Sequence, residues 1–421
     1  MSASRTPHAI NGGRMMKNCL VAQSGGPTAA INASLAGVVS AVINSNEYDN
    51  IYGSIHGIQG VFKKNFIDLS NSDEEFIERL SVTPAMYLGS CRYKLPSFET
   101  DEEAYKQIFD VFEEYNIGAF FYIGGNDSMD TVAKLSAYAE KIGSDVRIGG
   151  VPKTIDNDLL VTDHTPGFGS AAKYIASSIR EIAYDTFIYD VKSVTIIEIM
   201  GRDAGWLTAA SVLARNEFSP APHLIYLPEV AFDKKQFIED VNNMLKNYQN
   251  VIIAVSEGIR DKDGNYLSAT TAACDKFGHA QLSGTGKALE YLVKDEIGVK
   301  VRSVEVNVLQ RCAGHMASKT DIEESIALGK KAVALAAIGE TGFMTTIERI
   351  SNYPYQYNIG YTKVSGVANE AKSVPVEWIN EAGNDVTTDL IEYVRPLVQG
   401  EVELVYEDGI INYLDIGHLV S

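Results

Sequence analysis

The sequence predicts an α/β protein in which parallel-rich sheets are covered by helices on both faces. Two observations predict it: apolar, strand-like runs alternate with helical patterns along most of the chain, and several of these runs end in glycine-rich turns. The 421 residues suit two or three domains, and 45% of them are apolar, enough for a sizeable core. Ligands of such sheets bind at the carboxyl ends of the strands, so a functional site is expected there.

The first part of the chain alternates between the two patterns down to about residue 151. The expected strands are 19–22, 51–55, 119–123 and 146–151, and the expected helices are 29–43, 102–115 and 129–140. In the helix 102–115, the residues Tyr105, Ile108, Phe109 and Phe112 fall on one face, as in an amphipathic helix.

The alternation continues beyond residue 160, with expected helices at 170–182 and 234–246 and expected strands at 194–199, 224–227 and 251–255. From about Phe343 onward the pattern is less regular and richer in Tyr, Asn and Gly. We interpret this stretch as a C-terminal lobe with strands such as Val402 to Tyr406. Residues 1–16 lack the apolar core of a secretory signal, so we expect a flexible N-terminal extension.

The net charge of −19 argues against nucleic-acid binding, which needs a basic surface. No apolar run approaches the roughly 20 residues that a membrane helix needs, so no membrane partner is expected. The four cysteines are far apart and form no Cys-x-x-Cys motif, which favours reduced thiols and a cytoplasmic location. An anionic substrate would need a local cationic pocket inside this repelling field.

Two glycine-rich turns join an expected strand to an expected helix. In residues 23–28 (Gln-Ser-Gly-Gly-Pro-Thr), glycine would let the backbone approach an anion near a helix N-terminus, and a plain tight turn is an equal alternative. In residues 124–128 (Gly-Gly-Asn-Asp-Ser), Asp127 or Ser128 could cap the helix. Alternatively, an acidic residue there could hold a metal or reject a ligand.

Residues 152–158 (Pro-Lys-Thr-Ile-Asp-Asn-Asp) crowd a lysine, a hydroxyl and two carboxylates at one strand exit. Helix capping needs only one of these groups. A carboxylate suits a general base for a sugar hydroxyl, and a lysine could pair with a transferring phosphoryl group. A solvated polar loop is the alternative. Another strand ends at residues 200–202 (Met-Gly-Arg), where Arg202 could bind an anion or lie on the surface.

Together these segments resemble the 6-phosphofructokinase family, and within it the pyrophosphate-dependent phosphofructokinases. The matching segments follow the family's order and spacing over roughly residues 17–336, and they are Ser24-Gly25-Gly26, Leu88-Gly89-Ser90-Cys91-Arg92, Gly124-Gly125 with Ser128, Thr154-Ile155-Asp156-Asn157-Asp158, Met200-Gly201-Arg202 and Ser256-Glu257-Gly258. The resemblance implies the phosphofructokinase fold: two Rossmann-like three-layer α/β lobes with parallel-rich sheets, plus a C-terminal extension.

The expected division of the chain follows from this resemblance. Residues 17–151 would form a phosphoryl-donor (pyrophosphate) lobe and residues 152–340 a sugar-phosphate lobe. Part of 258–304 is a candidate to return to the first lobe, and residues 341–421 would form a C-terminal lobe packed on the core.

The resemblance also implies roles for individual residues. Asp156 would be the general base that takes the proton from the 1-hydroxyl of fructose 6-phosphate, with Thr154 and Asp158 around that hydroxyl and the metal. The implied sugar contacts are Met200, Gly201, Arg202 and Glu257, the implied clamps on the 6-phosphate are Arg302 and Arg311, and the implied donor ligands are Gly26 and Arg92. In this family one such arginine commonly comes from a neighbouring subunit, which implies a homodimer or homotetramer.

Two positions indicate the phosphoryl donor. ATP-using members of the family typically have glycine where this chain has Asp127 and Lys153, and pyrophosphate-using members typically have this Asp and this Lys. A carboxylate at Asp127 would add bulk and like charge where the α-phosphate of ATP must pass. Lys153 would supply a cation to a small, highly charged donor. Rejecting one donor while binding the other is how such specificity arises.

Two departures from the family pattern affect the metal and the sugar. The family's magnesium-binding aspartate falls at Asn126, whose amide oxygen is a weaker ligand for Mg²⁺. Ser193 and Val308 replace an arginine and a histidine of the bacterial ATP-using enzymes, which leaves a longer sugar such as sedoheptulose 7-phosphate open as the acceptor.

The expected activity is therefore Mg²⁺-dependent, reversible transfer from diphosphate to fructose 6-phosphate, giving fructose 1,6-bisphosphate and phosphate in glycolysis or gluconeogenesis. The alternatives are an ATP-dependent 6-phosphofructokinase and a non-catalytic subunit that senses a sugar phosphate.

Overall fold

A seven-stranded sheet organises the first lobe, with the strand order β11-β10-β5-β4-β1-β2-β3. The neighbours from β10 to β2 run parallel, and the edge strands β3 and β11 run antiparallel. The computed structural model describes residues 16–267, 284–367 and 371–420. The N-terminal elements of this lobe are β1 (Lys17–Gln23), α1 (Ile31–Ile43), β2 (Tyr48–Ser54), α2 (Gly57–Lys63), β3 (Phe66–Asp68), α3 (Glu74–Val82), α4 (Glu102–Glu114), β4 (Ile117–Gly124), α5 (Asn126–Ile142) and β5 (Arg147–Pro152).

Local sequence accounts for where several of these elements begin and end. All of β4 is buried, as expected for a central strand covered by helices on both faces. Helix α4 begins after Asp101, whose side chain accepts a hydrogen bond from the backbone N–H of Ala104. Helix α5 ends at Gly143, which has the left-handed φ of 68° that favours glycine at this position.

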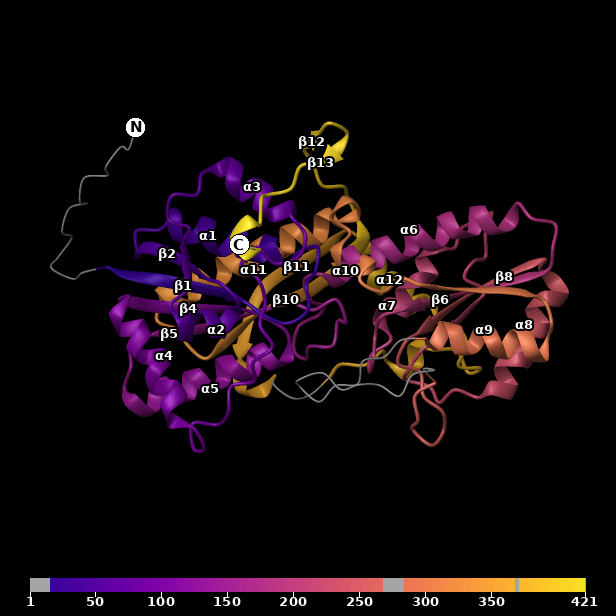
Figure 1. The fold of residues 1–421 in the computed structure, drawn as a ribbon, viewed down its shortest axis with the longest axis horizontal. Helices are drawn as coiled ribbons and strands as arrows, with labels where there is room; N and C mark the ends of the chain where they lie inside the picture. Colours follow the sequence, from indigo (N-terminus) through magenta and orange to yellow (C-terminus); the bar gives the residue numbers. More distant parts are fainter. Residues whose placement is uncertain (1–15, 268–283, 368–370, 421) are drawn as a thin grey trace.

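Four parallel strands in the order β7-β8-β6-β9 form the sheet of the second lobe. The predicted α/β class with parallel-rich sheets is thereby confirmed, and Figure 1 shows the two lobes side by side. The elements of this part of the chain are α6 (Phe168–Phe187), β6 (Ser193–Ile199), α7 (Trp206–Ala210), η1 (Ser211–Ala214), β7 (Leu224–Tyr226), α8 (Lys234–Asn247), β8 (Asn250–Ser256), α9 (Thr285–Glu296), β9 (Lys300–Glu305), α10 (Leu309–Cys312) and η2 (Gly314–Met316).

The chain returns to the first lobe earlier than the expected boundary at residue 340. Helix α11 (Lys319–Ala337) packs along α1, β10 (Phe343–Asn352) pairs with β5, and β11 (Tyr355–Lys363) completes the sheet edge. In Figure 1 these orange elements lie among the indigo and purple ones. The expected C-terminal lobe packed on the core is therefore wrong for β10 and β11, because the open edge of β5 supplies hydrogen-bonding partners that draw them into the first sheet.

The segment 258–304 does not return to the first lobe where the structure describes it. Helix α9 packs on β6 and β9, and β9 pairs with β6 in the second sheet. Residues 268–283, which belong to the same expectation, lie outside the described residues. The expected flexible extension 1–16 also lies outside them, except for the exposed Met16.

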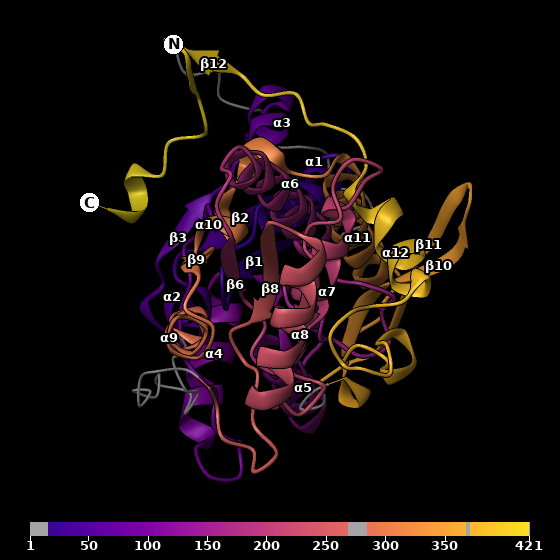
Figure 2. The same ribbon diagram turned by 90° about the vertical axis from the view of Figure 1, so that its right-hand side faces the viewer.

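The last part of the chain runs over both lobes with little regular structure. It contains η3 (Val364–Gly366), η4 (Val376–Trp378), α12 (Thr388–Val394), η5 (Arg395–Val398), β12 (Tyr406–Glu407), β13 (Ile410–Ile411) and η6 (Gly417–Leu419). The expected strand Val402–Tyr406 is wrong, because only Tyr406 of this range lies in a strand, β12 of the two-stranded β12–β13 hairpin. In Figure 2 the yellow tail extends past α3. There Arg79 donates a hydrogen bond to the Asn412 side chain at 3.1 Å, and Leu414 N–H donates one to Thr83.

Across 16–267, 284–367 and 371–420, no helix is both long enough and apolar enough to span a bilayer.

Candidate active site

A cleft of about 540 Å³ lies where the strand ends of both sheets meet. The turns after β1, β4 and β5 line it from the first lobe, and those after β6 and β8 line it from the second. Parallel strands bring their carboxyl ends to one edge, which explains why segments far apart in sequence converge here. The predicted site residues that line the cleft are Gly26, Arg92, Asn126, Asp127, Lys153, Thr154, Asp156, Asp158, Met200, Arg202, Glu257 and Arg311.

Lys153 leaves the end of β5 and extends beneath the glycine-rich turn after β1. It is only 2% exposed, and its Nζ donates a hydrogen bond of 2.8 Å to the carbonyl oxygen of Gly26. Gly25 has a φ of +84°, and a Cβ there would come within 3.0 Å of this Nζ, so the turn needs glycine. Burial lowers the pKa of Lys153 to about 8, although the carboxylates of Asp156 and Asp158 oppose this shift. The ammonium therefore stays largely charged at neutral pH.

Asp156 and Asp158 lie on the loop that follows Lys153. The N–H of Asp156 donates a hydrogen bond of 3.1 Å to Oγ1 of Thr154. Burial, together with the charge of Asp158, raises the pKa of Asp156 to about 7. Burial also raises the pKa of Asp158. Lys153, Ile155 and Asn157 are buried, so the alternative of a solvated polar loop is wrong, and the loop holds a carboxylate that can exchange a proton near neutral pH.

Asn126 is the first residue of α5 and contacts this loop. Its Nδ2 donates a hydrogen bond of 3.3 Å to Oδ2 of Asp158, while its buried Oδ1 has no hydrogen-bond partner. A buried acceptor without a partner is costly unless a ligand satisfies it. No three His, Cys, Asp or Glu side chains gather as a metal-binding group among the residues that the structure describes.

Asp127 is exposed on the first turn of α5 and faces the cleft. The capping interpretation of Asp127 or Ser128 is wrong, because Gly125 is the N-cap residue and no side chain caps this helix. Because the carboxylate of Asp127 does not cap the helix, it is available to contact or repel a ligand in the cleft.

The turn after β6 is held against the turn after β8. Gly201 has a φ of +138°, and its N–H donates a hydrogen bond of 3.4 Å to Oε1 of Glu257. The hydroxyl of Ser256 donates to the carbonyl oxygen of Gly201. A Cβ on Gly258 would lie 1.8 Å from the carbonyl oxygen of Arg202, so only glycine fits there. Burial and the charge of Asp156 raise the pKa of Glu257 to about 7.

The cleft contains the local cationic pocket that an anionic ligand needs in a protein of acidic net charge. Arg202 and Arg311 each have a buried Nε without a hydrogen-bond partner, and both guanidinium groups line the cleft. Arg92 and Lys94 are exposed and line the same cleft. With Lys153, these side chains provide positive charge to an anionic ligand from both lobes.

Arg302 is the one predicted site residue that the structure places well away from this cleft. It lies on β9, where its guanidinium donates hydrogen bonds to Asp185 at 2.8 Å, Thr186 at 3.0 Å and Thr195 at 3.3 Å. It lines a separate, small surface pocket together with Tyr189 and Val191. Within one chain, Arg302 and Arg311 therefore do not form a common clamp.

Comparison with known proteins identifies the family. The phosphofructokinase family model matches residues 18–336. The chain belongs to the phosphofructokinase family. It is 41% identical to the pyrophosphate–fructose 6-phosphate 1-phosphotransferase of Halomonas elongata, over 93% of this chain and 94% of that protein. It is 42% identical to the protein of the same name from Xanthomonas campestris pv. campestris, over 95% and 96%.

Among solved structures, the pyrophosphate-dependent phosphofructokinase of Nitrosospira multiformis superimposes with a TM-score of 0.85 at 39% identity, over 94% of this chain and 96% of that one. These similarities confirm the resemblance to the phosphofructokinase family that the strand-end motifs indicate.

Two residues outside the family's Thr-Ile-Asp-Asn-Asp loop, Lys372 and Tyr393, hold its Asn157 without having been predicted to do so. Asn157 is fully buried, and its Oδ1 and Nδ2 bind Thr165 N–H at 3.2 Å and the Tyr393 hydroxyl at 2.9 Å. Lys372 places its Nζ 2.6 Å from the carbonyl oxygen of Asp163. Tyr393 and Lys372 come from the irregular C-terminal segment, where no sequence pattern marks a lone tyrosine or lysine.

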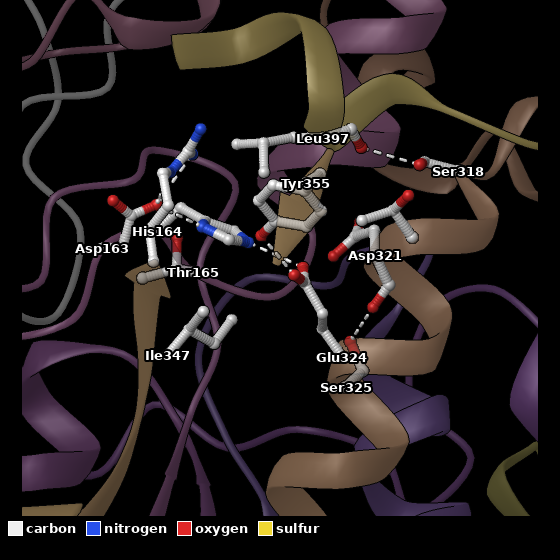
Figure 3. A network of polar contacts seen from close by, with 12 residues as sticks. Asp163, His164, Thr165, Ser318, Asp321, Glu324, Ser325, Ile347, Tyr355 and Leu397 are labelled. Atoms are coloured by element: carbon white, nitrogen blue, oxygen red, sulfur yellow. Dashed lines mark hydrogen bonds and ion pairs between the residues drawn. The ribbon is translucent and has the colours of Figure 1, made fainter. Parts of the chain in front are cut away.

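A buried ionic network is centred on His164, which follows this loop in the chain (Figure 3). His164 contacts Asp163 through Nδ1 and Glu324 of α11 through Nε2, both at 2.7 Å. Arg349 of β10 donates to Asp163, and the Tyr355 hydroxyl of β11 donates to Glu324. The network joins the loop to the elements that return to the first lobe.

Proposed function

We propose that the chain is a reversible, pyrophosphate-dependent phosphotransferase that converts fructose 6-phosphate and diphosphate to fructose 1,6-bisphosphate and phosphate, a step of glycolysis and gluconeogenesis. The observation that carries this proposal is a pair of residues, Lys153 and Asp127, at the donor side of the cleft. The buried ammonium of Lys153 binds the carbonyl oxygen of Gly26, and the carboxylate of Asp127 lines the same cleft. Relatives at about 40% identity, named for this reaction, support it.

The acceptor chemistry is assigned to Asp156. Its carboxylate takes the proton of the sugar 1-hydroxyl, and the oxygen attacks a phosphorus of diphosphate in line as the bond to the leaving phosphate breaks. A pKa of about 7 suits this role, because the carboxylate is available as a base near neutral pH and can return the proton in the reverse reaction. Thr154 and Asp158 position the hydroxyl beside it.

The donor and the sugar phosphate are held by the cations of the cleft. Lys153, Arg92 and the backbone at Gly26 hold diphosphate, while Asp127 excludes the α-phosphate of ATP by like charge and bulk. Arg202 and Arg311 offer unpartnered guanidinium nitrogens to the sugar phosphate. The remaining sugar contacts are assigned to Met200, Gly201 and Glu257.

Magnesium is the expected cofactor, and the residues present fit it. The unpartnered Oδ1 of Asn126 is an oxygen ligand next to the carboxylate of Asp158. Mg²⁺ in proteins commonly binds one or two such groups and takes its other ligands from water and substrate phosphates. When bound, it neutralises charge on the transferring phosphoryl group.

The proposed partners are these two substrates, with no nucleic acid and no membrane, in the cytoplasm. The enzyme is proposed to be a homodimer or homotetramer, because Arg302 lies outside the cleft of its own chain and would act only on the cleft of a neighbouring subunit.

A donor-and-acceptor panel tests the function. With Mg²⁺, the purified protein is expected to turn over diphosphate with fructose 6-phosphate and to show little activity with ATP; sedoheptulose 7-phosphate is the second acceptor. Activity with ATP and none with diphosphate would contradict the donor assignment. Replacing both donor residues, in Asp127→Gly with Lys153→Gly, should abolish use of diphosphate.

The general-base role has its own test. Asp156→Asn keeps the shape of the side chain but removes the base, and kcat is expected to fall by roughly 10²- to 10⁴-fold with a smaller change in KM. Near-normal turnover in Asp156→Asn would show that another group takes the proton. No turnover in the unmodified protein with any donor would favour the non-catalytic sensor.

A further inference from the structure

Lys372 lies at a junction between the C-terminal segment and the catalytic loop 153–158. Its backbone N–H donates a hydrogen bond of 2.8 Å to the carbonyl oxygen of Asp158. Its Nζ reaches back to the carbonyl oxygens of Asp163 at 2.6 Å and Thr162 at 3.2 Å, and to Oδ1 of Asn157 at 3.4 Å. Through its backbone and side chain together, Lys372 thus joins residues 157–158 to residues 162–163.

The backbone conformation of Asn157, which Lys372 contacts, is one that few residue types adopt. Asn157 has a left-handed φ of 54°, which turns the chain between the two aspartates. Few residues other than glycine adopt this conformation, and although asparagine tolerates it better than most, contacts to the side chain fix it in place. Here the side chain of Asn157 is bound by three groups: Lys372 Nζ, the Tyr393 hydroxyl and the N–H of Thr165.

Tyr393 completes the arrangement. Its hydroxyl accepts the hydrogen bond from Asn157 and donates one of 2.6 Å to the carbonyl oxygen of Asp163, the same oxygen that Lys372 binds. The main chain of Lys372 is itself held, since Trp206 Nε1 donates to its carbonyl oxygen at 2.8 Å. The ammonium therefore projects from a fixed backbone onto a fixed acceptor.

We propose that Lys372 is a positioning residue for the transfer reaction: its ammonium, together with Tyr393, holds Asn157 so that Asp156 and Asp158 present their carboxylates to the acceptor hydroxyl. This inference rests on the proposed function for its kinetic part. Lys372 acts through Asn157 on the acceptor side of the cleft. It makes no hydrogen bond to Lys153 or Gly26, so its effect falls on turnover rather than on donor binding.

The kinetic test uses Lys372→Met, which removes the ammonium and keeps the backbone contact to Asp158. The expected result is a fall in kcat of roughly 10²-fold, because a small misplacement of a catalytic group costs about that much. KM for diphosphate should stay within about threefold of the unmodified enzyme, because ground-state binding of the donor is not touched. A kcat within about threefold of the unmodified enzyme would overturn the proposal.

Lys173→Met is the matched control. Lys173 is also a mostly buried lysine whose Nζ binds backbone carbonyl oxygens, those of Gly400 at 2.6 Å and Ala317 at 3.4 Å, away from the loop. Lys173→Met is expected to keep nearly full kcat. An equal loss of kcat in both variants would show a general destabilisation and would overturn the positioning role.

Tyr393→Phe provides a second variant that removes only a hydroxyl, in case Lys372→Met does not fold. Its kcat is expected to fall several-fold with an unchanged KM for diphosphate, and an unchanged kcat would count against the proposal.

Amide hydrogen exchange separates this inference from the proposed function, since it does not depend on turnover. Peptides covering residues 154–168 should exchange faster in Lys372→Met than in the unmodified protein and in Lys173→Met. Unchanged exchange in these peptides would overturn the proposal even in an active enzyme. An unmodified protein without diphosphate turnover would refute the proposed function and leave the exchange result to decide this one.

Discussion

His164 is a buried side chain with a carboxylate at each ring nitrogen, Asp163 on one side and Glu324 on the other. Burial alone would lower its pKa, but the charge of Glu324 and the hydrogen bonds to both carboxylates outweigh burial and raise the pKa to about 9. Burial would raise the pKa of Asp163, yet His164 and Arg349 hold it at about 2. The protonated imidazole is thus part of the folded structure at neutral pH.

This pKa predicts a pH dependence of stability. The folded-state pKa of His164 exceeds its ordinary value of 6.5, so its stabilisation is complete below about pH 6.5 and is lost as the pH rises through 9. The free energy of unfolding should fall over this window by roughly 3 kcal/mol more than in His164→Gln, at 1.36 kcal/mol per pKa unit. Denaturant titrations of both proteins from pH 6 to pH 10 measure the difference. Parallel curves would contradict the prediction.

Helix α11 decides how the two lobes are joined. It packs along α1 in the first lobe, while its Asp321 accepts hydrogen bonds of 2.9 Å from the N–H groups of Gly167 and Ser170 at the start of α6. The close approach of α1 and α11 depends on two glycines. A Cβ on Gly37 would lie 2.2 Å from the carbonyl oxygen of Ile326, and one on Gly329 would lie 2.2 Å from that of Ser34.

Gly37→Ala or Gly329→Ala should therefore destabilise the protein. Either methyl group forces the helices apart and costs about 1–3 kcal/mol by overpacking, despite the better helix propensity of alanine. Thermal and denaturant unfolding measure the loss. Gly366→Ala is the control, because a Cβ there meets nothing within 4 Å. Equal stability of Gly37→Ala and Gly366→Ala would show that the helices separate at no cost.

At the scale of the whole molecule, Arg302 and the cleft do not meet within one chain. The exposed side chains Tyr184, Ile188, Tyr189 and Val191 lie on the same lobe, at the end of α6 and in the turn between α6 and β6. Tyr189 and Val191 line the small pocket of Arg302. An exposed apolar surface next to an arginine expected at a phosphate site suits contact with a second copy of the chain.

Co-expression of two inactive variants tests this arrangement. Asp156→Ala and Arg302→Ala should each lose most activity alone. If Arg302 acts on the neighbouring subunit of a dimer, random mixing restores about a quarter of the sites. Asp156→Ala with Arg202→Ala is the control, because both residues belong to one cleft and no site is restored. Failure of the first pair to recover activity would place Arg302 outside the site.

Much of the site was predictable because its residues are local. Lys153 and Asp156 lie on one short segment. Most segments that line the cleft follow a strand end, which glycine or proline marks in the sequence, and these strand ends meet at the cleft. The supporting residues were not predictable. Lys372 and Tyr393 lie more than 200 positions from Asn157, in a segment without periodicity, and only their contacts reveal a role.

The sequence by itself determined the α/β class, the family, and the set of strand-end residues that line the cleft. These follow from local patterns: apolar runs that bury strands, and short motifs whose spacing is set within one turn. The tertiary structure alone decided three things: that β10 and β11 join the first sheet, that Arg302 lies away from its own cleft, and that the C-terminal segment holds Asn157. Each outcome depends on which distant segment pairs with an open strand edge, binds a charged group or hydrogen-bonds a buried amide. These contacts form only when the whole chain packs.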